Sequence, residues 1–355
     1  MEKNVILSAR DIVVNFRVRS RVLTAIRNVS LDLIEGETLA IVGESGSGKT
    51  VLTKTFTAML EENGTVSQGK IFFEGRDLLE IKSNREWESI RGAKIATVFQ
   101  DPMTSLNPIR TIGSQITEVI IKHQKKSKQE AKEMAIDLMD KVGIPNAAAR
   151  FDEYPFQYSG GMRQRIVIAI ALACHPKILI CDEPTTALDV TIQAQIIQLI
   201  KKLQKDFGFT TVYITHDLGV VAAVADKVAV MYAGQIVEYG TVDEIYFNSK
   251  HPYTWALLSS LPQLGVKGQM LFSIPGTPPS LYNKVKGDAF APRNPYAMKI
   301  DFEEEPPFFQ VSETHFAKTW LLDPRAPKTE MPEFIQNLHE KIEKKVAFEG
   351  KLYVK

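Results

Sequence analysis

The sequence has few cysteines, no long apolar run and almost no net charge. Two cysteines among 355 residues are too few for a disulfide framework and favour a reducing compartment. The longest apolar run, Ile166–Cys174, is much shorter than the roughly 20 residues that span a bilayer. Residues 1–10 lack the apolar segment of a signal peptide. We therefore expect a soluble chain, or one held at a membrane only by its partners.

The charge balance gives no sign of a nucleic-acid partner. Lys and Arg number 43, Asp and Glu number 42, and the formal net charge is +1. Proteins that bind nucleic acid usually carry a basic surface, so we expect no nucleic-acid partner. With 44% hydrophobic residues, the chain is long enough to form two or three structural units.

Proline becomes frequent after about residue 250. This density predicts an irregular appended segment over 251–355 rather than a second α/β domain. Within the segment we expect Glu303-Glu304-Glu305 to be a solvated acidic surface and Glu333–Lys345 to be a charged helix. We therefore divide the sequence into residues 1–250 and 251–355.

The strongest motif reads G-x-x-x-x-G-K-T and lies between a predicted buried strand, Thr38–Val42, and a predicted helix, Val51–Leu60. Its glycines allow backbone N–H groups to turn toward an anion, and the N-terminus of the next helix adds partial positive charge. Lys49 would reach the outer phosphates and the Thr50 hydroxyl would bind Mg²⁺. This phosphate loop consists of Gly43, Glu44, Ser45, Gly46, Ser47, Gly48, Lys49 and Thr50.

Other strands and a helical insertion are predicted around this loop. β-Branched and apolar residues predict strands over Val5–Val18, Val22–Ile34 and Gly69–Gly75. Phe16 either stacks on a nucleotide base or is a half-buried strand residue, and the sequence leaves both interpretations open. Residues 104–155 contain no clear strand, and Ser127 with Glu130 predicts a helix start there. We interpret about 104–165 as a helical insertion.

Polar side chains follow three further predicted strands. Gln100 follows Lys94–Phe99, Asp182 and Glu183 follow an apolar run, and His216 follows Thr210–Thr215. In α/β sheets ligands bind at the carboxyl ends of the strands. Asp182 is therefore a candidate for holding Mg²⁺, and Glu183 for polarising an attacking water molecule. His216 is either a phosphate contact or a structural residue.

Together these motifs resemble the ATP-binding subunit of ABC transporters over about 250 residues. Gly43–Thr50 corresponds to the Walker A motif, Gln100 to the Q-loop, and Ile178–Glu183 to the Walker B motif with the catalytic glutamate. The signature sequence corresponds to Ser159, Gly160, Gly161 and Met162. The D-loop corresponds to Ala187-Leu188-Asp189, the switch histidine to His216 and the base-stacking aromatic to Phe16.

The resemblance implies an α/β P-loop NTPase fold. The expected architecture is an ABC-type nucleotide-binding domain over 1–250, followed by a Pro-rich C-terminal extension over 251–355. The domain has a RecA-like core, an antiparallel β subdomain and a helical subdomain at about 104–165. The implied ligands are ATP and Mg²⁺, with Thr50, Gln100 and Asp182 at the metal.

The same resemblance implies separate roles for these residues in ATP hydrolysis and in contacts with a second subunit. Lys49, Gln100, Glu183 and His216 would act in catalysis. The signature residues would contact ATP bound to a second ATPase subunit, because this chain has one copy of each motif, and Asp189 would belong to the D-loop.

The similarity is greater still to the oligopeptide and dipeptide importer subfamily, whose patterns match Gln100–Pro108, Ser159–Arg165, His251–Thr254 and Ile274–Pro279. The implied function is to power peptide import. The implied partners are a second ABC ATPase subunit, expected to be a paralogue, two integral membrane permease subunits and an extracytoplasmic peptide-binding protein. The chain would be peripheral on the cytoplasmic face of the cell membrane. The alternatives are a soluble ABC ATPase acting on nucleic acid or ribosomes, and an importer of another solute such as nickel.

Many members of this subfamily carry a cysteine cluster in the tail that binds an iron–sulfur centre. Asp288, Asn294 and Asp301 stand where those cysteines would be, and the fourth position, near Thr319, is not cysteine either. Iron–sulfur clusters need thiolate ligands, so we expect no iron–sulfur cluster. Cys174 and Cys181 lie elsewhere, and we expect both to be packing residues.

Overall fold

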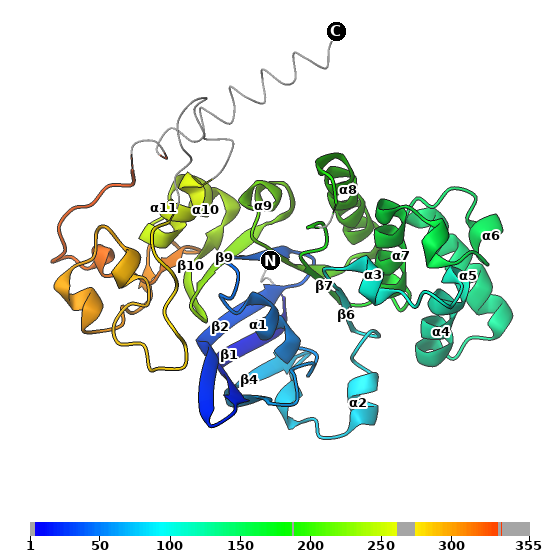
Figure 1. Ribbon diagram of the computed structural model, residues 1–355, viewed down its shortest axis with the longest axis horizontal. Helices are drawn as coiled ribbons and strands as arrows, with labels where there is room; N and C mark the ends of the chain where they lie inside the picture. Colours follow the sequence, from blue (N-terminus) through cyan, green and yellow to red (C-terminus); the bar gives the residue numbers. More distant parts are fainter. Residues whose placement is uncertain (1–3, 187, 261–273, 333–334, 336–355) are drawn as a thin grey trace, which may run out of the picture.

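The computed structural model describes residues 4–186, 188–260, 274–332 and 335. Figure 1 shows an antiparallel sheet below a larger sheet, with a helical region on the right and the C-terminal extension on the left. The predicted D-loop residue Ala187 and the predicted helix at 333–345, apart from residue 335, lie outside the described residues.

The antiparallel sheet has the strand order β2-β1-β4-β5. The predicted first two strands are confirmed as β1 (Val5–Val18) and β2 (Arg21–Ile34), which pair with each other. The third, β4 (Gly64–Phe73), begins five residues earlier than predicted and pairs with β5 (Arg76–Asp77). Gly69 does not start β4. It lies opposite a bulge in β1, where its φ of +103° brings the backbones close together.

The larger sheet places the ends of its central strands at one edge. Val42 pairs with Thr215 and Asp182 pairs with Ile214, so the segments after these parallel strands leave the sheet side by side. All five residues of the strand before the phosphate loop are buried. In sheet order, the strands in the described residues are β11 (Phe309–Gln310), β12 (Phe316–Ala317), β10 (Gln235–Thr241), β9 (Lys227–Tyr232), β3 (Thr38–Val42), β8 (Thr210–Thr215), β7 (Ile178–Asp182) and β6 (Ile95–Val98).

The predicted helical insertion contains no strand over 104–155. Ser127 and Glu130 form the predicted capping box, in which each side chain bonds the other residue's backbone N–H. The helix after the phosphate loop ends at Thr55, before the predicted Leu60, and Ala58 has a left-handed φ of 48°. The helices are α1 (Lys49–Thr55), α2 (Asn84–Glu88), α3 (Pro102–Ser105), α4 (Ile112–Gln124), α5 (Lys128–Lys141), α6 (Ala147–Arg150), α7 (Gly160–Leu172), α8 (Val190–Phe207), α9 (Leu218–Val224), α10 (Val242–Phe247) and α11 (Pro252–Ser259).

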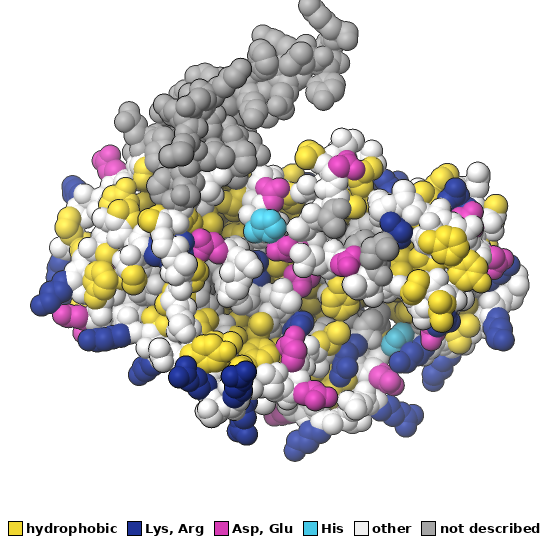
Figure 2. Space-filling model, viewed as in Figure 1, with side chains coloured by type: hydrophobic (Ala, Val, Ile, Leu, Met, Phe, Trp, Pro, Cys, Tyr) yellow, Lys and Arg dark blue, Asp and Glu magenta, His cyan; other side chains and the backbone are white. Residues whose placement is uncertain are grey.

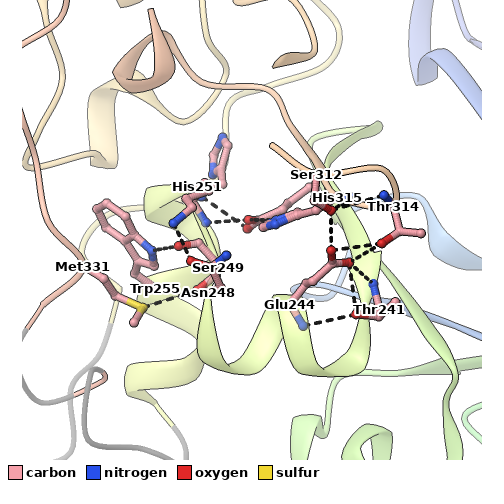
Figure 3. Close-up of polar contacts among 12 residues, drawn as sticks. Thr241, Glu244, Asn248, Ser249, His251, Trp255, Ser312, Thr314, His315 and Met331 are labelled. Carbon is pink, nitrogen blue, oxygen red and sulfur yellow. Dashed lines mark hydrogen bonds and ion pairs between the residues drawn. The ribbon is translucent and has the colours of Figure 1, made fainter. Parts of the chain in front are cut away.

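The C-terminal extension is more regular than its prolines predict. It begins with α11, and its strand β12 pairs with β10 and so extends the larger sheet. The fully buried Glu238 carboxylate of β10 accepts the backbone N–H groups of Lys250 at 2.5 Å and His251 at 3.2 Å. Its Oε1 also lies 2.8 Å from Nε2 of the buried His315. These contacts fix the extension to the core, and Figure 3 labels two of the residues involved, His251 and His315.

Two further carboxylates join the extension to the core. Glu244 binds the hydroxyls of Ser312 and Thr314, as Figure 3 shows. Glu303, Glu304 and Glu305 are exposed as predicted, and Glu305, with 42% of its side chain exposed, also accepts a hydrogen bond from Gln235 at 2.8 Å and pairs with Lys318. Burial alone would raise the pKa of the Glu305 carboxyl, but the hydrogen bonds leave the pKa below its usual value.

The surface carries both signs of charge. On the face in Figure 2, Lys and Arg side chains gather along the lower rim, with acidic side chains between them and toward the middle. None of the helices in the described ranges has the length and apolar character that crossing a membrane requires.

Candidate nucleotide-binding site

One cavity lies at the edge of the larger sheet where β3 and β7 end, and it reaches the antiparallel sheet. Its volume is about 800 Å³. It brings together predicted residues from four separate segments, namely Phe16, Ser45, Gly46, Gly48, Lys49, Thr50, Gln100, Asp182 and Glu183. The parallel register explains why the phosphate loop, Gln100 and the Asp182-Glu183 pair converge, because these three segments leave the larger sheet at the same edge, whereas Phe16 comes from β1 of the antiparallel sheet.

The phosphate loop wraps around the Lys49 ammonium group. Lys49 Nζ donates to the carbonyl oxygens of Gly43 at 2.8 Å and Glu44 at 3.0 Å, and the side chain is buried. Burial lowers the pKa of Lys49, while the carboxylates of Glu183 and Asp182 act in the opposite direction. A Cβ on Gly43, whose φ is +150°, would overlap the carbonyl oxygen of Met231. This close approach of two backbones requires glycine.

Asp182 and Glu183 point toward different partners. Asp182 Oδ1 accepts a hydrogen bond from the Thr50 hydroxyl at 3.0 Å, and burial raises the pKa of this carboxyl. Glu183 Oε1 lies 3.0 Å from Nδ1 of His216, and Oε2 accepts from Gln100 Nε2 at 3.2 Å. The Glu183 backbone has a left-handed φ of 48°. A strained backbone at a site with converging polar groups is typical of a functional position.

The oxygen donors around Thr50 fit a small hard cation. The Thr50 hydroxyl and the Asp182 carboxylate are within hydrogen-bond distance of each other, and the Gln100 side chain lines the same cavity. Mg²⁺ prefers oxygen ligands and usually needs only one or two from the protein beside substrate phosphates. The residues present therefore fit Mg²⁺.

Phe16 is a largely buried strand residue that also lines the cavity, and its stacking on a nucleotide base stays a prediction. It lines the cavity, but only 9% of its surface is exposed. Gly64 covers the ring so closely that a Cβ there would lie 2.6 Å from it. Little of the Phe16 ring is therefore left to contact a ligand in the cavity.

Other cavity residues were missed by sequence reasoning. They are Val18, Leu23, Ala25, Val51, Glu61, Asn63, Pro279, Ser280, Leu281 and Tyr282. The first six lie in or near elements that were predicted for other reasons. The last four belong to the C-terminal extension, and no short motif in the sequence connects them with the phosphate loop.

The signature and D-loop residues do not line this cavity in the part of the chain that the structure describes. Ser159 caps α7 by accepting the Met162 backbone N–H at 3.3 Å, with Gly160 and Gly161 between them. Asp189 caps α8 through the Ile192 backbone N–H at 3.0 Å. Three loop residues, Gly43, Glu44 and Ser47, are also absent from the lining.

The side chains at Asp288, Asn294, Asp301 and Thr319 do not fit an iron–sulfur cluster. They supply oxygen and amide groups rather than thiolates. Each accepts a backbone N–H instead: Asp288 from Phe290, Asn294 from Tyr296, Asp301 from Met298 and Thr319 from Leu321. Local hydrogen bonds therefore organise this part of the extension, and the absence of a cluster stays a prediction.

Comparison with known proteins agrees with the site. Residues 26–186 match the family model described as ABC transporter, and residues 237–300 match the model of the oligopeptide/dipeptide transporter C-terminal region. The chain is similar in structure to the ATP-binding cassette MJ0796, a dimer in a post-hydrolysis state bound to ADP and Pi. The TM-score is 0.59 at 27% identity, over 66% of this chain and 98% of that one. The fold and the site define an ABC-type ATPase.

Sequence relatives show to which family of ABC-type ATPases the chain belongs. The chain is 72% identical to the oligopeptide transport ATP-binding protein AmiE of Streptococcus pneumoniae, over 98% of each chain. It is 56% identical to the oligopeptide transport ATP-binding protein OppD of Bacillus subtilis, over 93% of each. The chain belongs to the family of oligopeptide and dipeptide transport ATP-binding proteins.

Proposed function

We propose that the chain binds and hydrolyses ATP to power the import of peptides through a multi-subunit ABC transporter. One observation carries this proposal. A cavity of nucleotide size joins the phosphate loop to Gln100 and the Asp182-Glu183 pair, in a chain 72% identical to an oligopeptide transport ATP-binding protein.

The polar residues in and beside the cavity have different roles in binding and hydrolysing ATP. Lys49 and the backbone N–H groups of the phosphate loop bind the β- and γ-phosphates. Thr50, Gln100 and Asp182 would hold Mg²⁺, which supplies positive charge beside the phosphates when it is bound. Glu183 orients and polarises the attacking water, and His216 contacts the γ-phosphate. The contacts of Glu183 with both Gln100 and His216 support this arrangement.

A second ATPase subunit completes the site. Ser159, Gly160, Gly161, Met162 and Asp189 lie outside the lining of this chain's own cavity. We assign the four signature residues to ATP held by the partner, which is expected to be a paralogue. The similarity to a dimeric cassette supports this assignment. ATP binding closes the dimer, and hydrolysis reopens it.

The closing and reopening of this dimer drive conformational changes in a membrane complex. Residues 1–250 form the ATPase domain, and the helical subdomain at about 104–165 contacts two integral membrane permease subunits. An extracytoplasmic peptide-binding protein delivers the solute. The chain sits peripherally on the cytoplasmic face of the membrane and needs no nucleic acid. The match of residues 237–300 to a peptide-transporter C-terminal region supports the assignment of 251–355 as an extension specific to these importers.

The test is peptide uptake by the complete transporter in proteoliposomes. Lys49→Ala removes the ammonium group that the phosphate loop surrounds, so we expect loss of both ATP hydrolysis and uptake of labelled peptides. Lys299→Ala, in a side chain that is 89% exposed, is the matched control and should leave both unchanged. Normal uptake with Lys49→Ala would contradict the proposed site. Uptake of nickel but not peptides would contradict the proposed solute.

A further inference from the structure

The C-terminal extension forms one wall of the nucleotide cavity. Pro279, Ser280, Leu281 and Tyr282 line it together with residues of β1 and β2. The Leu281 carbonyl oxygen accepts the backbone N–H of Thr24 in β2 at 3.1 Å, which fixes this segment beside the apolar side of the cavity. Figure 1 shows the gold segment after residue 274 running down beside β2.

Two aromatic residues line the cavity, and Tyr282 is the more exposed of the two. Its side chain is 40% exposed, whereas Phe16 is 9% exposed and covered by Gly64. Phe16 pairs with Leu23 of β2, and Leu281, the chain neighbour of Tyr282, accepts the Thr24 backbone N–H of the same strand, so both aromatic residues line the cavity beside β2. An exposed aromatic ring beside apolar side chains favours a flat, apolar ligand group such as a nucleobase.

The extension also holds the phosphate loop directly. Arg293 Nη1 and Nη2 bond the two carboxylate oxygens of Glu44 at 2.7 and 2.9 Å. The arginine side chain is 4% exposed and the glutamate side chain 28%. The ion pair with Glu44 raises the pKa of the guanidinium. A two-point, buried arginine–carboxylate pair fixes orientation as well as position.

The same guanidinium connects the loop to the cavity wall. Arg293 Nε donates to the Pro275 carbonyl oxygen at 2.8 Å, where the segment leading to Leu281 begins. A hydrogen bond to the Tyr232 hydroxyl at 3.1 Å fixes the arginine from the side of the core. One side chain therefore anchors both the Walker A loop and the segment that lines the base side of the cavity.

We propose that the extension is part of the nucleotide site: Tyr282 contacts the base of ATP, and the Arg293–Glu44 pair positions the phosphate loop. This inference rests on the proposed function, because it assigns further residues to the same ATP site. Tyr282 is a binding residue. Arg293 is a positioning residue that acts through Glu44.

Tyr282 is tested by ATP binding to the full-length chain. Tyr282→Ala should weaken ATP binding by about fivefold, since an aromatic contact is lost, and Tyr282→Phe should restore it. The matched control is Phe302→Ala, in an aromatic residue of the extension that is 50% exposed and does not line the cavity. In addition, Tyr282→Trp should give an ATP-dependent fluorescence change that the parent chain lacks. Unchanged ATP affinity in Tyr282→Ala, or no added signal from Tyr282→Trp, would overturn this part.

Arg293 is tested by a double-mutant cycle on ATP affinity. Arg293→Ala and Glu44→Gln should each weaken binding by about tenfold, and the double variant should be no weaker than either, because both remove the same charged contact. Arg293→Lys should not restore affinity, since an ammonium group does not make the two-point contact. Arg325→Ala, which breaks an exposed side chain's pair with Asp323, is the control. Additive losses would overturn the positioning role.

Failure of this inference is distinguishable from failure of the proposed function. If Lys49→Ala abolishes ATP binding while the Tyr282 and Arg293 variants bind normally, the ATP site stands and the extension has no part in it. If Lys49→Ala binds ATP normally, the proposed site itself is wrong.

Discussion

Asp288→Asn should stabilise the protein near neutral pH. Asp288 is 6% exposed, and burial raises the pKa of its carboxyl from 3.8 to about 6. The fold therefore disfavours the ionised form. Asparagine keeps an oxygen that can accept the Phe290 backbone N–H, now at 2.9 Å, and it carries no charge.

The size and the pH dependence follow from the pKa difference. Below pH 3.8 the carboxyl is protonated in both the folded and the unfolded chain, and the fold bears no ionisation cost. The cost grows as the pH rises toward 6 and is constant above it. A difference of about two pKa units corresponds to roughly 3 kcal/mol, which is the largest stabilisation expected for Asp288→Asn at pH 7.5.

Paired chemical denaturation of the parent chain and Asp288→Asn should be measured from pH 4 to pH 7.5. The difference in free energy of unfolding should rise with pH and approach zero at the acid end. Asp323→Asn is a control of opposite sign, because the exposed Arg325 pair lowers the pKa of Asp323 to about 2. Removing the Asp323 carboxylate should lower the free energy of unfolding above the pKa that this group has in the unfolded chain. The loss should disappear as the pH falls. Equal stability of Asp288→Asn and the parent at pH 7.5, or a gain that does not change with pH, would refute the reasoning.

Three further predictions concern the loop, the acidic pair and the extension. Glu183→Gln should keep ATP binding but lower the hydrolysis rate of the complete transporter about 10²- to 10⁴-fold, and a near-normal rate would remove Glu183 from catalysis. Gly43→Ala should abolish ATP binding and lower the melting temperature, whereas Gly46→Ala, with open space around it, should show a smaller loss in both assays; equal losses would contradict the steric argument. Glu238→Ala should destabilise the chain by roughly 3 kcal/mol or more, since two buried groups and one partly buried N–H lose their partner, and unchanged thermal unfolding would contradict this.

Much of the nucleotide site could be predicted because its residues follow strands directly. A buried parallel strand fixes where the next residue emerges, so the motifs at Lys49, Gln100 and Glu183 were enough to predict one shared edge. The limits of β1 and the start of the insertion's capped helix also follow from local patterns. The predicted roles of these residues in catalysis stay predictions.

The extension could not be predicted in the same way. Its contacts join positions far apart in the sequence, such as Glu305 with Arg27 and His315 with Glu238. Proline density describes the local backbone and says nothing about a short strand that adds to a distant sheet edge. A backbone hydrogen bond of Leu281 holds the neighbouring Tyr282 at the cavity. Any residue type at position 281 could make this bond, because it uses only the backbone carbonyl group. Such contacts leave no pattern in the sequence.

The position of the phosphate loop in the chain has a consequence for synthesis. The loop follows β3, yet the sheet neighbours of β3 are β8 and β9, which begin at residues 210 and 227. Arg293, which binds the Glu44 carboxylate, lies 249 positions further along the chain. Contacts of such large sequence separation carry a high entropic cost of closure and form late. A chain emerging from the ribosome therefore exposes its phosphate loop early and can complete it only near the end of translation, which delays nucleotide binding until most of the subunit has been made.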